Sequence, residues 1–219
     1  MCDLRPILFV CVFALVIVAC GGGSGDGDAD DDPGAVPPPA PPAPVTLVSD
    51  WRMDCSFAVQ PRIASYSGLI RVGDDQLRSQ LVGYLMFPLA ALPAEPTIVS
   101  ATLTVYQEGT SWAPYTDLGP VLVDQVDVGT GVEHGVVDYP VVHSGFGVLS
   151  TEASVGIKSL DVTPLLREAV TAGRSRLDLR LRIESPTDDD SFPDQARFNS
   201  GEDEASVAQP PMIQVVLGP

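Results

Sequence analysis

The segment RLDLRLRIE, from Arg176 to Glu184, restricts the fold more than any other part of the chain. Leucine or isoleucine stands at every second position, with charged residues between them. Successive side chains of a β-strand point to opposite faces, so the pattern gives a strand with one apolar and one charged face. A helix would spread the same residues around its whole surface. The segment therefore predicts a strand that buries one face in an antiparallel sheet.

The same period of two residues recurs elsewhere in the chain. Residues 101–107, ATLTVYQ, alternate between apolar and polar, whereas residues 80–87, QLVGYLMF, are apolar on both faces and predict an interior strand. Residues 121–128, VLVDQVDV, and residues 212–217, MIQVVL, predict two more strands. The 20 glycines and 21 prolines provide the breaks between such strands.

One helix is predicted, in the segment DVTPLLREAVTAG. Thr163 is the expected N-cap, Pro164 the first helical residue, and Gly173 the residue after the helix end. Many short strands with one short helix predict an all-β fold, an antiparallel, jelly-roll-like β-sandwich over residues 45–219. We expect Trp51 and Cys55 to lie in its core.

The N-terminal residues indicate an exported protein. Ile7 to Ala19 form an apolar run of about thirteen residues, shorter than the about twenty that span a bilayer, as in a secretory signal over residues 1–19. The end of this run and the cysteine after it, IVAC (17–20), resemble the lipobox of bacterial lipoproteins. This resemblance implies cleavage before Cys20 and lipid attachment to Cys20. A plain cleaved signal or a short anchor helix remains the alternative.

Residues 20–44 predict a disordered tether, because a Gly/Asp-rich part and the run PPPAPPAP cannot form a core. Such a spacer reaches at most roughly 75 Å at about 3.1 Å per residue. We therefore expect secretion across the inner membrane and a lipid anchor in the cell envelope. Gly21 and Gly22, in place of an aspartate, favour the outer membrane.

The charge of the chain excludes two kinds of partner. Asp and Glu number 29 and Lys and Arg 12, which gives a formal charge of −17. Nucleic acids and anionic lipid surfaces need basic protein surface, so we expect neither as a partner. No nucleophile elbow, phosphate loop or dinucleotide fingerprint is present, and His134 and His143 match no standard zinc spacing. An enzyme is therefore disfavoured.

Several segments share their order with one known family. They are RVGDDQLRSQLVGYLMFPLAALPAEPTIVSATLTVYQEGT (71–110), LRLRIESPTDDD (179–190), ARFNSGE (196–202) and PPMIQV (210–215). Together they resemble the DNRLRE-type surface β-sandwich domains, which are related to carbohydrate-binding module family 96. The resemblance implies a non-catalytic module that binds glycans or holds larger assemblies together.

Two sets of residues are candidates for glycan binding. Trp112 and Tyr115, in TSWAPYTD, can stack on sugar rings; alternatively, the tryptophan folds back onto the sandwich edge. Arg176, Arg180 and Arg182 lie on one strand face and can pair with carboxylates of an acidic polysaccharide. For these arginines we favour the alternative, ion pairs with acidic residues on neighbouring strands.

Loop carboxylates are candidates for a structural calcium site, because calcium prefers oxygen ligands. A solvated acidic rim is the alternative that we favour. The candidates are Asp74, Asp75, Asp188, Asp189, Asp190 and Glu202.

Three functional hypotheses follow. The first is a lipid-anchored binding or scaffolding module of the cell envelope that binds glycans. The second is a structural or adhesive surface protein with a protein partner, and the third is an envelope polysaccharide hydrolase.

Overall fold

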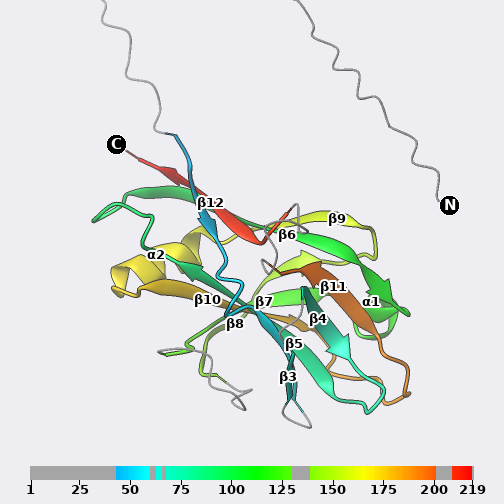
Figure 1. The fold of residues 1–219 in the computed structure, drawn as a ribbon. Coiled ribbons are helices and arrows are strands. Elements are labelled where there is room, and N and C mark those ends of the chain that lie inside the picture. Colours follow the sequence, from blue (N-terminus) through cyan, green and yellow to red (C-terminus); the bar gives the residue numbers. More distant parts are fainter. Residues whose placement is uncertain (1–42, 60–62, 66–67, 130–138, 201–208, 219) are drawn as a thin grey trace, which may run out of the picture. The chain divides into compact units, whose positions relative to one another are not determined.

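The strand pattern leads to a single antiparallel sheet that curls on itself (Figure 1). A computed structural model describes residues 43–218, except 60–62, 66–67, 130–138 and 201–208. Within these ranges twelve strands join into one sheet. The predicted antiparallel all-β fold is thus confirmed, although the two layers belong to one curled sheet. The predicted signal and most of the tether lie outside the described residues, as do Cys20, His134 and Glu202.

The first half of the sheet is built on the long strand β6 (Ile98–Ser111). One side of β6 pairs first with β12 and then with β11, and β9 pairs with residues 102–107. β1 pairs with β12, and β4 pairs with β11. The bounds are β1 Val45–Val48, β4 Leu69–Asp74, β9 Gly156–Asp161, β11 Gln195–Asn199 and β12 Met212–Leu217.

The second half is built on β5 (Gln80–Pro88), which pairs with β10. β7 follows β10, and β8 follows β7. A short pairing of β4 with β5 joins the two halves, β2 pairs with β5, and β3 pairs with β2. The bounds are β2 Cys55–Ala58, β3 Ile63–Ser65, β7 Val121–Val126, β8 Val141–Ser150 and β10 Arg176–Ile183.

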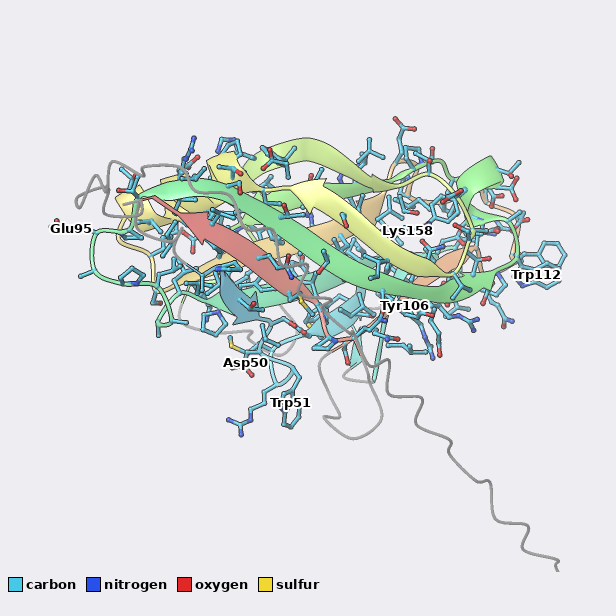
Figure 2. The ribbon with its side chains drawn as sticks, turned by 90° about the horizontal axis from the view of Figure 1, so that it is seen from above. Asp50, Trp51, Glu95, Tyr106, Trp112 and Lys158 are labelled. Carbon is cyan, nitrogen blue, oxygen red and sulfur yellow. The ribbon has the colours of Figure 1, made fainter. Side chains whose placement is uncertain are left out.

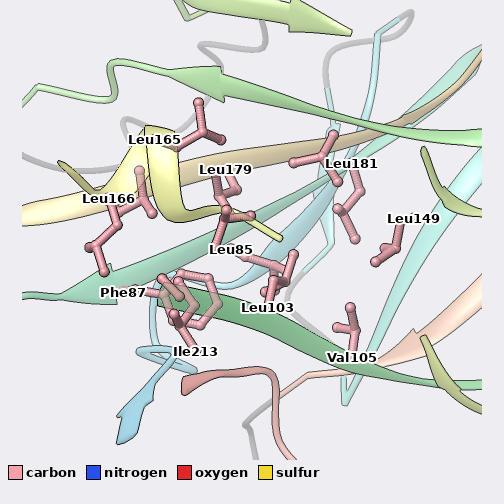
Figure 3. Packing of buried hydrophobic residues seen from close by; sticks show 14 of the residues in the cluster. Leu85, Phe87, Leu103, Val105, Leu149, Leu165, Leu166, Leu179, Leu181 and Ile213 are labelled. Carbon is pink, nitrogen blue, oxygen red and sulfur yellow. The ribbon is translucent and has the colours of Figure 1, made fainter. Parts of the chain in front are cut away.

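The two halves face each other across one apolar core. The residues of β10 that the alternation predicts to point inward are all fully buried there: Leu177, Leu179, Leu181 and Ile183. Figure 3 shows leucines of β5, β6, β10 and the second helix gathered in this core. Each buried leucine contributes about 1.5–3 kcal/mol, so the period-two pattern is the main source of stability.

Strand β5 is buried on both faces, as its sequence predicts. Leu85 and Phe87 point into the main core, whereas Val82, Tyr84 and Met86 belong to a second apolar cluster. In that cluster the Tyr84 ring packs edge-on against Phe57 and Tyr139, with ring centroids 5.5 and 5.4 Å away. Cys55, on β2, is buried there too, which confirms its predicted place in a core.

The described residues form two helices, where the sequence predicts one. α2 (Thr163–Thr171) covers one end of the core with Leu165, Leu166 and Ala169. Its N-cap is Val162 and not Thr163, because the Thr163 hydroxyl accepts the Ala101 N–H at 2.8 Å and ties the helix to β6. The second helix, α1 (Pro114–Asp117), is a single turn after β6. Neither helix is long and apolar enough to cross a membrane.

The expected core position of Trp51 is wrong. The Trp51 side chain is 41% exposed, in the turn that leads into β2, and the Arg52 guanidinium lies over its ring at 5.4 Å. In the turn around it, residues 49–54, four of the other five residues are polar or charged, so the turn offers the ring little apolar surface. Figure 2 shows Trp51 extending away from the strands.

Candidate functional site

An exposed pair of aromatic rings, Trp112 and Phe192, marks one end of the curled sheet. Their ring centroids are 4.6 Å apart and their planes are tilted by 46°. Trp112 is 64% exposed and Phe192 is 51% exposed. Figure 2 shows Trp112 projecting from the end of the ribbon that lies opposite Glu95. Apolar rings of this size are normally buried, so their exposure in contact with each other indicates a contact surface.

The pairing of β6 with β11 brings these distant residues together. Gln195, the first residue of β11, lies opposite Ser111, the last residue of β6. Because the strands are antiparallel, the chain beyond Ser111 meets the chain before Gln195. Trp112 therefore comes to lie beside the segment that contains Phe192 and Asp194, about eighty residues later in the sequence.

Unusual backbone conformations hold both rings in place. Trp112 has a φ of +56°, in the left-handed region that bulky residues rarely adopt. The next residue, Ala113, donates its backbone N–H to the Asp194 carboxylate at 2.7 Å. On the other side, the Phe192 N–H is donated to Asp190 at 2.6 Å, and Ser191 has a φ of +101°. These hydrogen bonds offset the strain and fix the display of the rings.

Carboxylates surround the aromatic pair. Oxygens of Asp117, Asp188 and Asp194 all lie within 4.8 Å of one another, and Asp74 accepts the Asp194 N–H at 3.0 Å. Burial raises the pKa of both Asp74 and Asp194, neighbouring acidic charges raise it further, and hydrogen bonds to each carboxylate oppose the rise. Among the described residues, no salt bridge neutralises Asp117, Asp188 or Asp194. We call the aromatic pair and these carboxylates the aromatic end.

A shallow hollow of about 350 Å³ adjoins the aromatic end. It shares Pro193 with the segment that carries Phe192, and Leu77, one of the most exposed apolar side chains, forms another part of its wall. Asp75, Gln76 and Gln195 complete its lining. The hollow thus offers amide and carboxylate groups beside two apolar side chains.

Tyr115, which the sequence pairs with Trp112, lies elsewhere. Its hydroxyl donates to the Gln107 side-chain oxygen at 2.6 Å, and its ring packs against the main core. Burial raises the pKa of the Tyr115 hydroxyl. The helical turn of α1 accounts for the difference, because it turns Tyr115 inward directly after Trp112. Phe192 takes the place expected for Tyr115.

The arginine stripe is engaged in ion pairs. Arg180 and Arg182 both donate to one Asp124 oxygen, at 2.7 and 3.0 Å, and Arg176 donates to Asp178 at 2.6 Å. Asp124 is fully buried, and it lies opposite Arg180 in the register of β7 and β10. This is the cross-strand pairing that the sequence favours over binding of an acidic polysaccharide. We call Asp124, Asp178 and the three arginines the arginine-paired face.

The calcium candidates are only partly brought together. Asp188 belongs to the cluster with Asp117 and Asp194. The charges of Asp188 and Asp190 also act on the Asp74 carboxylate. The Asp75 carboxylate instead accepts the N–H groups of Leu77 and Ser79 in the β4–β5 turn. Asp189 is exposed in the loop with a φ of +66°.

Sequence reasoning missed three residues of the aromatic end: Asp117, Phe192 and Asp194. Asp117 stands in the quoted segment TSWAPYTD, five residues after Trp112. Nothing in the sequence marked Phe192 and Asp194, since their contact with Trp112 and Ala113 depends on the strand register.

Comparison with known proteins adds no relative. No family model matches the chain, and no curated protein is significantly similar to it. The relationship to DNRLRE-type domains is therefore a proposal that rests on the segments quoted from the sequence.

Proposed function

We propose that this domain is a non-catalytic carbohydrate-binding module whose ligand stacks on Trp112 and Phe192. The observation that carries the proposal is the pair of exposed, contacting rings on a constrained backbone. One face of a sugar ring consists of C–H groups, which pack well on aromatic rings, and its edge carries hydroxyl groups. A platform that is already in position loses little conformational entropy on binding.

The groups around the platform suit the hydroxyl edge of a sugar. Carboxylate oxygens such as those of Asp188 and Asp190 accept hydrogen bonds from hydroxyls, and the amide of Gln76 can both donate and accept. The same carboxylates repel negative charge. We therefore expect neutral or amino sugars as ligands, in preference to polyuronates or sulfated polymers.

Neither of two side chains with catalytic chemistry is placed for it. Cys55 is buried in the second apolar cluster, where burial raises the pKa of its thiol and keeps it protonated. His143 is bound to Glu168 on α2 at 2.5 Å, away from the aromatic end. Both placements argue against thiol and imidazole chemistry by these two residues.

The cellular setting belongs to the same proposal. A lipid on Cys20 and the Pro-rich tether would hold the domain outside the cytoplasm, where polysaccharides are within reach. Intact-mass measurement of the native protein tests this step. A mature chain that begins at Cys20 and carries acyl chains is expected, and an unprocessed, unacylated N-terminus would contradict it.

The binding experiment uses the full chain in affinity electrophoresis against laminarin, xylan, mannan, chitosan and polygalacturonate. Each polymer is tested with calcium and with chelator. Trp112→Ala and Phe192→Ala should each weaken retention by about ten-fold, which corresponds to about 1.4 kcal/mol. Trp51→Ala is the matched control, because Trp51 is the other exposed tryptophan and should leave retention unchanged.

A protein partner is the second candidate, and one observation favours it. Val155 and Ile157 are exposed beside or on β9, which pairs only with β6 in the described part of the chain. An exposed edge strand with apolar side chains can accept a strand from a partner. If no polymer retains the wild type, and surface cross-linking yields a defined adduct with wild type but not with Ile157→Lys, this candidate replaces the first.

A further inference from the structure

We infer that Asp194 is a positioning residue that sets the geometry of the Trp112–Phe192 platform. The inference rests on the proposed function, because the platform is its subject. Asp194 touches neither ring. It contacts the backbone next to one ring and the backbone of the other, and so it acts through both.

Asp194 supports the backbone next to Trp112. Its left-handed backbone is unfavourable for a residue with a large side chain, and a local turn alone does not stabilise it. The neighbouring Ala113 N–H donates to Asp194 Oδ1 at 2.7 Å. Ala113 is also the N-cap of α1, and no side chain of its own segment caps that helix. The carboxylate of Asp194 is thus the side-chain acceptor that holds this turn.

Asp194 also contacts the backbone of Phe192. The Asp194 backbone N–H lies 3.2 Å from the Phe192 carbonyl oxygen and 3.0 Å from Asp74 Oδ1. Asp74 lies at the end of β4, so these contacts fix the Phe192 segment to the rigid sheet. One residue therefore links the backbone next to Trp112 with the backbone of Phe192.

Asp194 is itself held in a fixed position. Asp194 is only 1% exposed, and it stands directly before β11, whose pairing with β4 and β6 fixes its position. A buried side chain directly beside a paired strand keeps one orientation, whereas Trp112 and Phe192 lie on loops. Through the contacts of Asp194, the sheet restricts the positions of the two exposed rings.

Fluorescence can test the inference, because the chain has two tryptophans. Trp51→Phe leaves Trp112 as the single fluorophore of the full chain. In this background Asp194→Ala should speed the anisotropy decay of Trp112 and increase its quenching by acrylamide. Asp194→Asn should leave both unchanged, because the amide oxygen still accepts the Ala113 N–H.

Retention on the polymer that binds the Trp51→Phe parent, among laminarin, xylan, mannan and chitosan, is the second readout. Asp194→Ala should weaken it by about ten-fold and Asp194→Asn should restore it. Val215→Ala, on β12 with its side chain in the main core, provides a destabilised control that should keep retention and anisotropy. A merely structural Asp194 would behave like this control.

The two proposals fail in different ways. If Asp194→Ala leaves the anisotropy and the retention at parental values, the positioning role is wrong and glycan binding stands. If none of the polymers retains the parent, glycan binding is wrong, and the anisotropy of Trp112 still decides the role of Asp194.

Discussion

The aromatic end and the arginine-paired face contain the same kind of buried carboxylate in opposite surroundings. Asp124 receives two guanidinium groups as well as the Gly145 N–H, so its charge is matched. Asp194 receives one backbone N–H, and the charges that act on it are those of other aspartates. The charges of the first arrangement are paired within the domain, so they are not available to a charged ligand. The second leaves negative charge beside the exposed rings, where the ligand that we propose would meet it.

The largest effect is expected from Asp124→Asn. It removes the counter-charge of Arg180 and Arg182, which are largely buried, and leaves two positive charges close together. Breaking a buried ion pair from one side costs about 3 kcal/mol or more. Urea unfolding followed by far-UV circular dichroism measures the loss, and a loss below about 1 kcal/mol would show that Asp124 is not the centre of this face.

The same change at the aromatic end should have the opposite sign. Asp194→Asn removes a charge that burial and neighbouring aspartates disfavour, while the acceptor for the Ala113 N–H is kept. We expect the unfolding free energy to rise by up to about 1 kcal/mol. The same urea experiment compares the two variants directly. A loss of stability in both would mean that the two carboxylates do not differ in the way described.

The contrast also separates what the sequence reveals from what it hides. The strands β5, β6 and β10 could be predicted, because their alternation reflects burial on one or two faces. On the inward face of β9, Leu160 packs against the main core, whereas Lys158 is charged and its ammonium group reaches Glu152 and Ser154 at 3.1 and 3.0 Å. Apolar alternation therefore does not mark this strand.

The candidate site was predictable only in part, for a related reason. Trp112 is conspicuous in its own segment, and the ion pairs of the arginines follow from the excess of acidic residues. The partners of Trp112 depend on the register of β6 against β11, which places Ser111 opposite Gln195. Hydrophobic patterns identify strands, but they do not state which strand ends meet.

The smallest predicted effect is a pH dependence with opposite signs in two regions. Asp74 and Asp194 have raised pKa values, chiefly through burial, so the folded state holds their protons more tightly than the unfolded chain does. Their contribution to stability is full below the unfolded pKa of about 3.9 and is lost as the pH rises through the folded pKa. Acidification from neutral pH should therefore stabilise the aromatic end.

Asp161, before α2, has a lowered pKa, because it accepts hydrogen bonds from the Thr163 hydroxyl and the Thr163 N–H. Its contribution is present above the unfolded pKa of about 3.9 and is lost as the pH falls below it. Urea unfolding between pH 7 and pH 3 should show a rise and then a fall in stability. Asp74→Asn with Asp194→Asn should remove the rise alone, and Asp161→Asn should weaken the fall. A rise that survives the double substitution would show that the aromatic end is not its source.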